Sequence, residues 1–340
     1  MATDGNRTGT NPLIDLCAEK GRLVADGGMG TSLFELGLRA GETPEVWNVD
    51  NPDGVARVHQ GFVDAGADII LTNTFGGTRA RLDLDGQGHR VEELNRAAVA
   101  IARRVASSSG RRVMVAGSLG PIGMLFEPLG ELTHANAVTL FREQMTALAS
   151  AGADVLWIET LSSTEELAAA VEATSGFDLP IVTTMSFDTN GRTMMGVAPR
   201  ELPEWWELAS SNPTAIGANC GVGPADVVQA VHEIRAASGD TVVVAKANCG
   251  IPKMIDGELW YPASADDSYA YAELALDAGA RIVGACCGSV PEHIEQIRKV
   301  VDTYVPSEYL NPDEVSSRLG GSNPSRKPKR QRVRRRHRSS

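Results

Sequence analysis

Short apolar runs alternate with longer amphipathic stretches along most of the chain. Eight runs rich in Val, Ile, Leu and Ala predict buried strands at 22–26, 68–73, 113–118, 154–159, 180–186, 215–219, 241–247 and 281–285. The apolar residues within each run are nearly continuous, which is typical of parallel strands covered on both faces, whereas a strand with one wet face alternates. The pattern therefore favours a parallel sheet buried inside the protein.

The stretches between these runs carry apolar residues at three- to four-residue spacing, which predicts helices, for example over 91–107, 136–151, 165–174 and 225–236. Three of the helices end in Ala-Gly-Ala, at 65–67, 151–153 and 278–280, and glycine is well suited to the residue that follows a helix. Eight strand–helix repeats over 13–304 predict an α/β fold, a single (β/α)8 TIM barrel. A doubly wound sheet is the alternative, but it suits eight regular repeats without a G-x-G-x-x-G motif less well.

Composition and charge separate a globular body from its C-terminal end. The 340 residues are 42% hydrophobic and 22% charged, as expected for a protein with a large core. Nine Lys or Arg and no acidic residue lie between Arg326 and Arg338, against 23 basic and 43 acidic residues elsewhere. A block of like charges without apolar residues cannot pack, so we expect residues 305–340 to form an extension that ends in a disordered basic tail. The acidic body argues against nucleic-acid binding.

The N-terminal segment MATDGNRTGTNPL has neither the basic region nor the apolar region of a secretory signal. No apolar run reaches the ~18 residues that a membrane span requires. Five cysteines are an odd number, and four of them follow residue 219, which favours metal or redox chemistry over a disulfide framework. We therefore expect a cytoplasmic protein with no membrane partner.

Polar residues and thiols stand where the predicted strands end. The first four strands end at Asp26, Asn73, Ser118 and Glu159, the sixth just before Cys220, the seventh before Asn248 and Cys249, and the eighth before Cys286 and Cys287. The active site of a TIM barrel lies at the carboxyl ends of its strands. Since packing gives no reason for carboxylates and thiols at the ends of apolar strands, we expect them to converge on one mouth.

Cys220, Cys286 and Cys287 are candidate ligands of a zinc ion. Three protein ligands leave one of four tetrahedral positions open, as in a catalytic site, whereas a structural site closes all four. Three thiolates give the Zn²⁺ site a net negative charge, which suits it to holding a substrate thiol as a nucleophilic thiolate. We therefore expect Zn²⁺ as the cofactor and a thiol as the substrate, with Cys249 either a neighbour of the site or a bystander.

Six motifs resemble the homocysteine S-methyltransferase family over about residues 13–300: DGGMGT at 26–31, AGADIILTNTF at 65–75, GSLGP at 117–121, GANCG at 217–221, NCGIP at 248–252 and GACCG at 284–288. The family includes betaine–homocysteine methyltransferases, S-methylmethionine-dependent enzymes and the homocysteine module of methionine synthase. The resemblance implies a zinc-bound homocysteine thiolate that attacks a methyl group in line, giving methionine, with no further catalytic side chain. One departure is NCGIP, where many members have NAGLP.

The resemblance also implies how L-homocysteine is bound. Asp26 and Glu159 match positions used around its amino group. The backbone N–H groups of Gly27 and Gly28, with Asn73 nearby, match those placed for its carboxylate. A zwitterionic amino acid needs anionic groups and donors at opposite ends, and this set supplies both.

The methyl donor is not fixed by these motifs. We favour a small onium compound, glycine betaine or dimethylsulfoniopropionate, because Trp47, Phe75 and Tyr261 stand in loops after the predicted strands. Each ring could hold a cation through an attraction of about 0.5–2 kcal/mol. The alternative donors are S-methylmethionine and a separate methyl-corrinoid protein, since we expect no cobalamin-binding domain here. An alternative of another class is a zinc-binding regulatory or nucleic-acid-associated protein that uses the basic tail. The sequence leaves the oligomeric state open.

Overall fold

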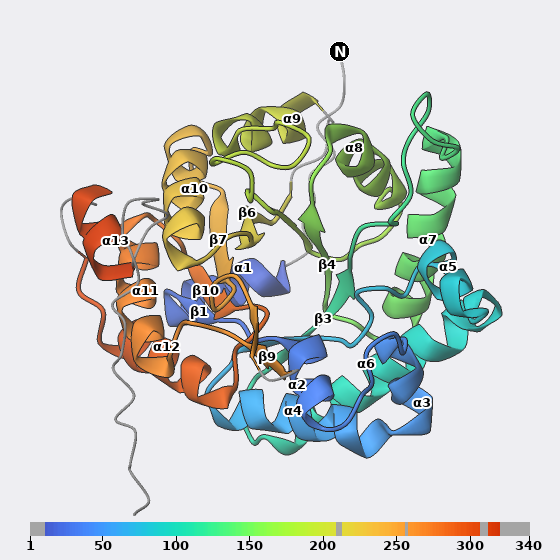
Figure 1. Ribbon diagram of the computed structural model, residues 1–340, viewed down its shortest axis with the longest axis horizontal. Coiled ribbons are helices and arrows are strands. Elements are labelled where there is room, and N and C mark those ends of the chain that lie inside the picture. Colours follow the sequence, from blue (N-terminus) through green and yellow to red (C-terminus); the bar gives the residue numbers. More distant parts are fainter. Residues whose placement is uncertain (1–10, 209–212, 256–257, 307–311, 320–340) are drawn as a thin grey trace, which may run out of the picture.

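The computed structural model describes residues 11–208, 213–255, 258–306 and 312–319, which form a ring of parallel strands surrounded by helices (Figure 1). The strands are β1 (Leu23–Val24), β2 (Ile69–Leu71), β3 (Met114–Leu119), β4 (Val155–Leu161), β5 (Ile181–Met185), β6 (Ala215–Cys220), β7 (Val242–Ala247) and β10 (Ile282–Ala285). They pair in the order β1-β10-β7-β6-β5-β4-β3-β2, and a parallel bridge between Ala25 and Ile69 joins β1 to β2. Each predicted strand overlaps one of these, and the predicted TIM barrel is confirmed.

Helices follow the strands and cover the outside of the ring (Figure 1). They are α2 (Met29–Glu35), α3 (Trp47–Asp50) and α4 (Pro52–Asp64) after β1, α5 (Arg79–Leu82) and α6 (Val91–Ser108) after β2, α7 (His134–Ser150) after β3, α8 (Thr164–Ala173) after β4, α9 (Leu202–Leu208) after β5, α10 (Pro224–Ala237) after β6, α11 (Ala265–Asp277) after β7 and α12 (Pro291–Thr303) after β10. Short 3₁₀ turns lie at Pro44–Val46, Asp83–Asp85, Gly88–Arg90 and Pro199–Glu201. Gly66, Gly152 and Gly279 follow helices with φ of 102°, 94° and 99°, as the Ala-Gly-Ala pattern predicts.

Apolar side chains form two layers. The outer layer, which includes Phe62 of α4, packs between the strands and the helices. The inner layer fills the barrel and includes the fully buried Trp157. Leu13 and Leu16 of α1 (Pro12–Lys20) belong to this inner layer, so α1 closes the amino end of the barrel. The opposite, carboxyl end is left for the site.

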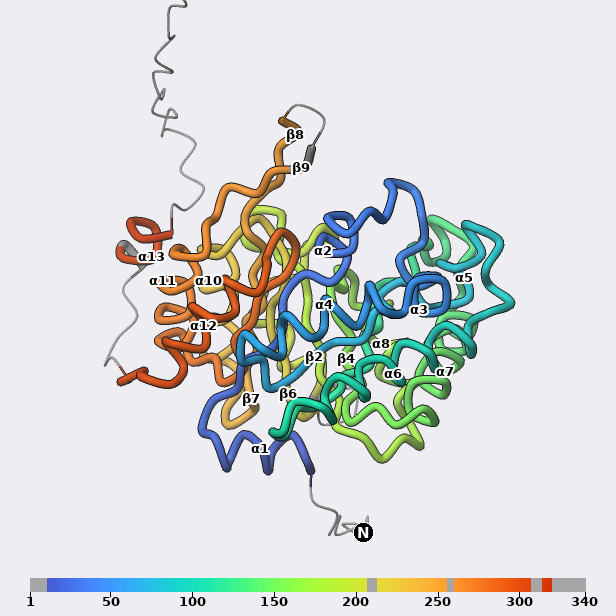
Figure 2. The backbone as a smooth tube through the Cα atoms, turned by 90° about the horizontal axis from the view of Figure 1, so that it is seen from below, coloured from blue at the N-terminus to red at the C-terminus, as the bar shows by residue number. Residues whose placement is uncertain are grey.

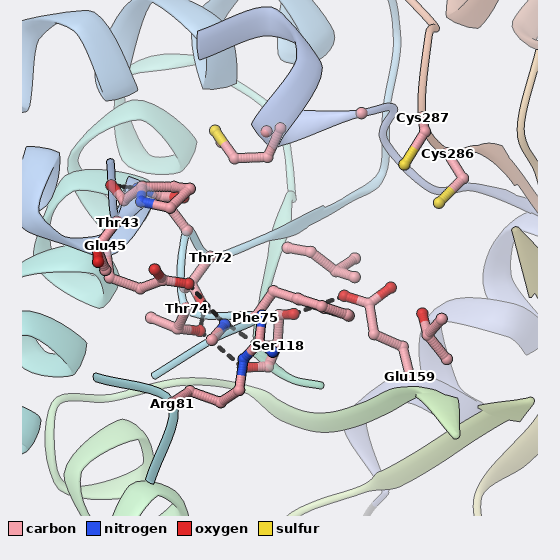
Figure 3. A pocket seen from close by; sticks show the side chains of 18 of the residues that line it. Thr43, Glu45, Thr72, Thr74, Phe75, Arg81, Ser118, Glu159, Cys286 and Cys287 are labelled. Carbon is pink, nitrogen blue, oxygen red and sulfur yellow. Dashed lines mark hydrogen bonds between the residues drawn. The ribbon is translucent and has the colours of Figure 1, made fainter. Parts of the chain in front are cut away.

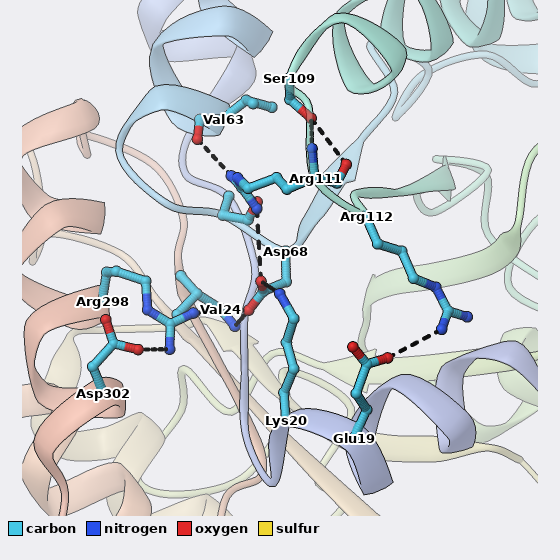
Figure 4. A network of polar contacts seen from close by, with 11 residues as sticks. Glu19, Lys20, Val24, Val63, Asp68, Ser109, Arg111, Arg112, Arg298 and Asp302 are labelled. Atoms are coloured by element: carbon cyan, nitrogen blue, oxygen red, sulfur yellow. Dashed lines mark hydrogen bonds and ion pairs between the residues drawn. The ribbon is translucent and has the colours of Figure 1, made fainter.

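A buried carboxylate ties the amino end of the barrel together (Figure 4). Asp68 accepts the Val24 N–H at 2.9 Å and pairs with Lys20 of α1 at 2.6 Å. Arg298 of α12 lies 2.9 Å from the same carboxylate, and Arg111 lies 3.7 Å from it. Asp68 thereby links α1 and α12 to the first two strands. Breaking such a buried charge network typically costs about 3–5 kcal/mol, so this cluster stabilises the scaffold of the site.

The connection after β7 contains a hairpin that the apolar pattern does not predict. Its strands β8 (Lys253–Ile255) and β9 (Glu258–Trp260) pair antiparallel. The hairpin stands out from the body at the end opposite α1 (Figure 2). Met254 and Trp260 are 66% and 47% exposed, so the hairpin contributes little to the core.

The predicted C-terminal extension contains a helix, α13 (Pro312–Leu319), which packs against α10 and α11. Arg318 of this helix pairs with Glu273 of α11. The part of the extension before the basic tail is therefore helical in this segment, whereas the basic tail itself lies outside the described residues. Among the helices that the structure describes, none has the length and apolar character to cross a membrane.

Candidate active site

Three thiols lie together at the carboxyl end of the barrel. Cys220 is the last residue of β6, and Cys286 and Cys287 follow β10. Their sulfur atoms all lie within 4.8 Å of one another, and the Sγ atoms of Cys220 and Cys287 are 4.0 Å apart. All three are free thiols. Cys220 has a φ of +59°, which is uncommon for a residue other than glycine and typical of a functional site.

The three thiols fit a zinc ion. Tetrahedral zinc with Zn–S bonds of about 2.3 Å places two sulfurs about 3.8 Å apart, close to the 4.0 Å between Cys220 and Cys287. Hydrogen bonds from Cys220 and Cys286 lower the pKa of Cys287, whereas the pKa values of Cys220 and Cys286 themselves are raised, so without a metal the cluster favours one thiolate, at Cys287. Within the described residues, no other group of His, Cys, Asp and Glu side chains is close enough to share a metal. Cys249 is not part of the cluster, and burial raises the pKa of its thiol to about 12.

A buried ion pair lies beside the thiols. The Asp26 carboxylate follows β1 and is 1% exposed, and its Oδ1 lies 2.7 Å from Nζ of Lys246 on β7. Its Oδ2 accepts the backbone N–H of Leu71 at 2.7 Å. Burial alone would lower the pKa of Lys246, but the Asp26 and Glu159 carboxylates outweigh it and raise this pKa above its ordinary value. Burial also raises the pKa of Asp26, and Lys246 opposes that shift, so each member of the pair favours the charged form of the other.

Glu159 lies on the neighbouring side of the site, within β4. Its Oε1 accepts a hydrogen bond of 2.5 Å from the Ser118 hydroxyl (Figure 3). Burial raises the pKa of Glu159 to about 7, although Lys246 opposes this shift. Thr160, with a φ of +64°, donates its N–H to Oδ1 of Asn219 at 2.9 Å and accepts from the same amide at 2.7 Å. These bonds fix the end of β4 against β6.

Gly27 and Gly28 allow the first loop to approach the cysteine loop closely. A Cβ at Gly27 would lie 2.5 Å from the Ser289 hydroxyl, and one at Gly28 would lie 2.8 Å from the carbonyl oxygen of Cys286. Neither position therefore accepts a larger residue without movement of its neighbours. The Gly28 N–H donates to Ser289 Oγ at 2.9 Å. One of the two backbone donors predicted for a substrate carboxylate is thus already paired within the protein.

A cavity of about 380 Å³ connects the thiols with the loops after β1 and β2. Near the thiols its lining includes Lys246, Glu159, Ser118, Gly27 and Gly28, and farther out it includes Glu42, Thr43, Glu45, Phe75, Arg81 and Asp85. Figure 3 shows Cys286 and Cys287 at one side of this space and Thr43 and Glu45 at the other. The volume suits a small-molecule site.

Most predicted substrate-binding residues line this cavity, but some of their polar groups are already hydrogen-bonded within the protein. Phe75, Asn73, Glu159 and the two glycines line it. The Asn73 amide donates to the Pro44 carbonyl at 2.7 Å, so it holds the loop after β1 in place. Asp26 reaches the site through Lys246 and does not itself line the cavity.

The aromatic residues predicted for the donor are dispersed. Trp47 lines a neighbouring pocket with Val46 and Asp50. Tyr261 packs against Gly288, where an added Cβ would lie 2.2 Å from its ring. Burial, reinforced by the nearby Cys287, raises the pKa of Tyr261 to about 12. These positions do not form a single aromatic cage with Phe75.

Sequence reasoning missed Lys246, Glu45 and Arg81. Lys246 is the charged residue of an otherwise Val and Ala strand, and this contrast is a usable signal. Glu45 is 4% exposed, and its Oε1 accepts the Gly76 N–H at 2.6 Å. Neither Glu45 nor Arg81 follows a strand directly, so no strand-end rule points to them.

A closed parallel barrel whose cavity joins three thiols to a buried ion pair is a barrel enzyme with a candidate metal centre. The chain belongs to the homocysteine S-methyltransferase family, a family of methyltransferases, whose model matches residues 23–301.

Curated relatives are similar to this chain in sequence, and a solved structure has the same fold. It is 29% identical over 308 residues to the methionine synthase of Mycobacterium tuberculosis, covering 85% of this chain and 25% of that protein. The identity to the methionine synthase of Mycobacterium leprae is 28% over 298 residues, covering 82% and 24%. The chain thus spans about a quarter of the length of these curated relatives. The metallated form of the homocysteine methyltransferase MmuM from Escherichia coli has the same fold, with a TM-score of 0.72 and 23% identity over 85% of this chain and 99% of that one.

Proposed function

We propose that this protein transfers a methyl group from a small onium donor to the thiol of L-homocysteine and so produces methionine, with Zn²⁺ held by Cys220, Cys286 and Cys287. The observation that carries the proposal is the cluster of three free thiols at the inner end of a cavity of about 380 Å³. Family membership supports homocysteine as the acceptor. We expect this activity in the cytoplasm, where reducing conditions keep such thiols free.

The three cysteines would provide three of the four ligands of the ion. When bound, zinc favours the thiolate form of a substrate thiol near neutral pH. Glu159 lines the cavity beside the cysteines and is the acidic group placed to pair with the substrate ammonium. Binding both substrates in one cavity would align the sulfur with the methyl group of the donor, and such alignment counts heavily in a bimolecular displacement.

The transfer forms one bond and breaks one. The substrate sulfur bonds to the methyl carbon while the bond from that carbon to the nitrogen or sulfur of the onium donor breaks. The donor leaves as a neutral amine or thioether with the electron pair of the broken bond. No proton moves in this step, so the site needs no general base for it.

The outer part of the cavity supports a cationic donor. Glu42 and Asp85 line it, and Phe75 is its aromatic residue within the described chain. Glu45 lines it too, but burial raises the pKa of this carboxyl group and so disfavours its charged form. One ring contributes about 0.5–2 kcal/mol to binding a cation. Arg81 lines the same region and could pair with the carboxylate of glycine betaine or dimethylsulfoniopropionate. Because acidic groups also suit an ammonium, S-methylmethionine is the second candidate donor.

The test is a donor panel with zinc-loaded protein and L-homocysteine, in which methionine is detected by mass spectrometry. Betaine, dimethylsulfoniopropionate, S-methylmethionine and S-adenosylmethionine are each supplied alone, and Cys286→Ser is the inactive control. Turnover with betaine or the sulfonium supports the proposal. Silence with every small donor, despite bound zinc and measurable homocysteine binding, would refute the onium donor and favour a methyl-carrying protein.

A further inference from the structure

Lys246 is a charged residue inside the strand Val-Val-Val-Ala-Lys-Ala. It is 2% exposed, yet it lines the cavity together with Glu159 and Cys286. Removing an ammonium from water carries a cost of several kcal/mol unless partners compensate it. The contacts of Lys246 must therefore offset the free-energy cost of burying its charge.

The Lys246 ammonium carries more N–H donors than its bond to Asp26 uses. A lysine carries three N–H groups, and in the described part of the chain its hydrogen-bond partner is Oδ1 of Asp26, at 2.7 Å. The ring of Trp157 lies 5.9 Å from Nζ. Asp26 is itself anchored through Oδ2 to the Leu71 N–H. The ion pair is therefore held in place, and the remaining N–H groups are available on the side of the cavity.

Two of the other groups that could receive a substrate carboxylate are occupied. The Gly28 N–H is bonded to Ser289, and the Asn73 amide is bonded to the Pro44 carbonyl. Among the described residues that line the cavity, the cations are Lys246 near the thiols and Arg81 at the outer part. Lys246 is thus the cation that lines the cavity next to the thiols, where a substrate carboxylate would bind.

We infer that Lys246, held in position by Asp26, binds the carboxylate of the thiol substrate and makes the acceptor site specific for thiols that carry a carboxylate. Glu159, which lines the same cavity, then pairs with the substrate ammonium. This inference rests on the proposed function and deepens it, because it assigns one end of the acceptor to a named side chain. Asp26 acts through Lys246 as a positioning residue.

Three small-molecule ligands distinguish the contributions of the two substrate charges. They are L-homocysteine, 3-aminopropane-1-thiol, which lacks the carboxylate, and 4-sulfanylbutanoate, which lacks the ammonium. Their dissociation constants for zinc-loaded protein are measured by isothermal titration calorimetry, which does not depend on methyl transfer. Since a hydrogen bond to a charged group contributes about 10-fold or more to affinity, the wild type should prefer homocysteine over 3-aminopropane-1-thiol by at least that factor. In Lys246→Met, homocysteine and 4-sulfanylbutanoate should both weaken while 3-aminopropane-1-thiol is unchanged.

Lys299→Met, at an exposed position on α12, is the matched control and should bind as the wild type does. The single variant Lys246→Met leaves the buried Asp26 carboxylate unpaired, which can prevent folding. In that case the double variant Asp26→Asn/Lys246→Met, which removes both charges, tests the same loss of preference. An equal loss for all three ligands, or an unchanged preference, would overturn the assignment while leaving homocysteine as the acceptor. Tighter binding of the two amines by Lys246→Met would also overturn it, since Lys246 would then compete with the substrate ammonium. A wild type that binds no homocysteine would overturn the proposed function as well.

Discussion

His59 should make the fold sensitive to acid. This histidine lies in α4 with 0% of its surface exposed, and neither ring nitrogen has a hydrogen-bond partner among the described residues. Burial lowers its pKa from 6.5 to about 4. The folded protein therefore holds the imidazole neutral over a range in which the unfolded chain protonates it.

The sign and size of the effect follow from this difference. Between pH 6.5 and 4 the unfolded state binds more protons than the folded state, so the free energy of unfolding falls as the pH falls. The difference between the two pKa values corresponds to about 3 kcal/mol once the pH is below 4. Of this, about 2 kcal/mol is lost between pH 7.5 and pH 5.

The assay is urea unfolding of the wild type and of His59→Leu at pH 7.5 and pH 5. The leucine removes the titrating group, so the stability of the variant relative to the wild type should rise by about 2 kcal/mol at the lower pH. Any packing difference between the two side chains is common to both pH values and cancels. His89→Leu, at an exposed position, should show the pH dependence of the wild type. If wild type and His59→Leu lose stability in parallel, the reasoning about His59 is wrong.

Three further outcomes test the site. Cys286→Ser should lower the zinc content, measured by atomic emission after dialysis, well below one ion per chain, and a fully loaded variant would contradict the ligand assignment. Glu159→Gln should raise KM for homocysteine by about 10-fold or more, because a charged hydrogen-bond partner of the substrate ammonium is lost, while its effect on kcat is small. Phe75→Leu should lower kcat/KM for an onium donor by about 2- to 30-fold through loss of one cation–π contact. Phe34→Leu, at a position that is 41% exposed, is its control, and equal kinetics of the two variants would remove Phe75 from the donor site.

The barrel could be predicted because its strands are buried on both faces. Such strands appear as short continuous apolar runs, and the turn glycines that follow α4, α7 and α11 mark where helices stop. The β8–β9 hairpin could not be found in this way, because its exposed residues contribute little to the core and hydrophobic periodicity reports burial. The helix α13 has only 8 residues, and its buried Val315 and the nearby Leu319 are too few to establish a period.

Part of the site could be predicted from the alternation of side chains along a strand. Val242 and Val244 of β7 belong to the inner layer, so alternation directs Lys246 into the barrel as well. The same rule holds for β4, where Val155 and Trp157 face inward and the next position in the series is Glu159. Applied to each strand, this rule would have found the missed lysine. The rule does not apply between strands, because the path of the connection decides where a side chain points. Trp47, in the connection between β1 and β2, accordingly lines a different pocket from the one beside the thiols.

Cys220 shows where alternation fails and why the failure matters. In β6, Ala215 belongs to the inner layer, whereas Ile216 and Ala218 pack outward against the helices. Continued alternation would direct Cys220 outward too, away from the other thiols. Its φ of +59° breaks the extended backbone at that residue, and its side chain lines the cavity instead. A left-handed residue other than glycine is strained, and the Gly221 N–H, which donates to the Ser186 hydroxyl at 3.1 Å, helps to hold the turn. The protein therefore accepts local backbone strain at the residue whose thiol must leave the pleat of the strand to complete the cluster.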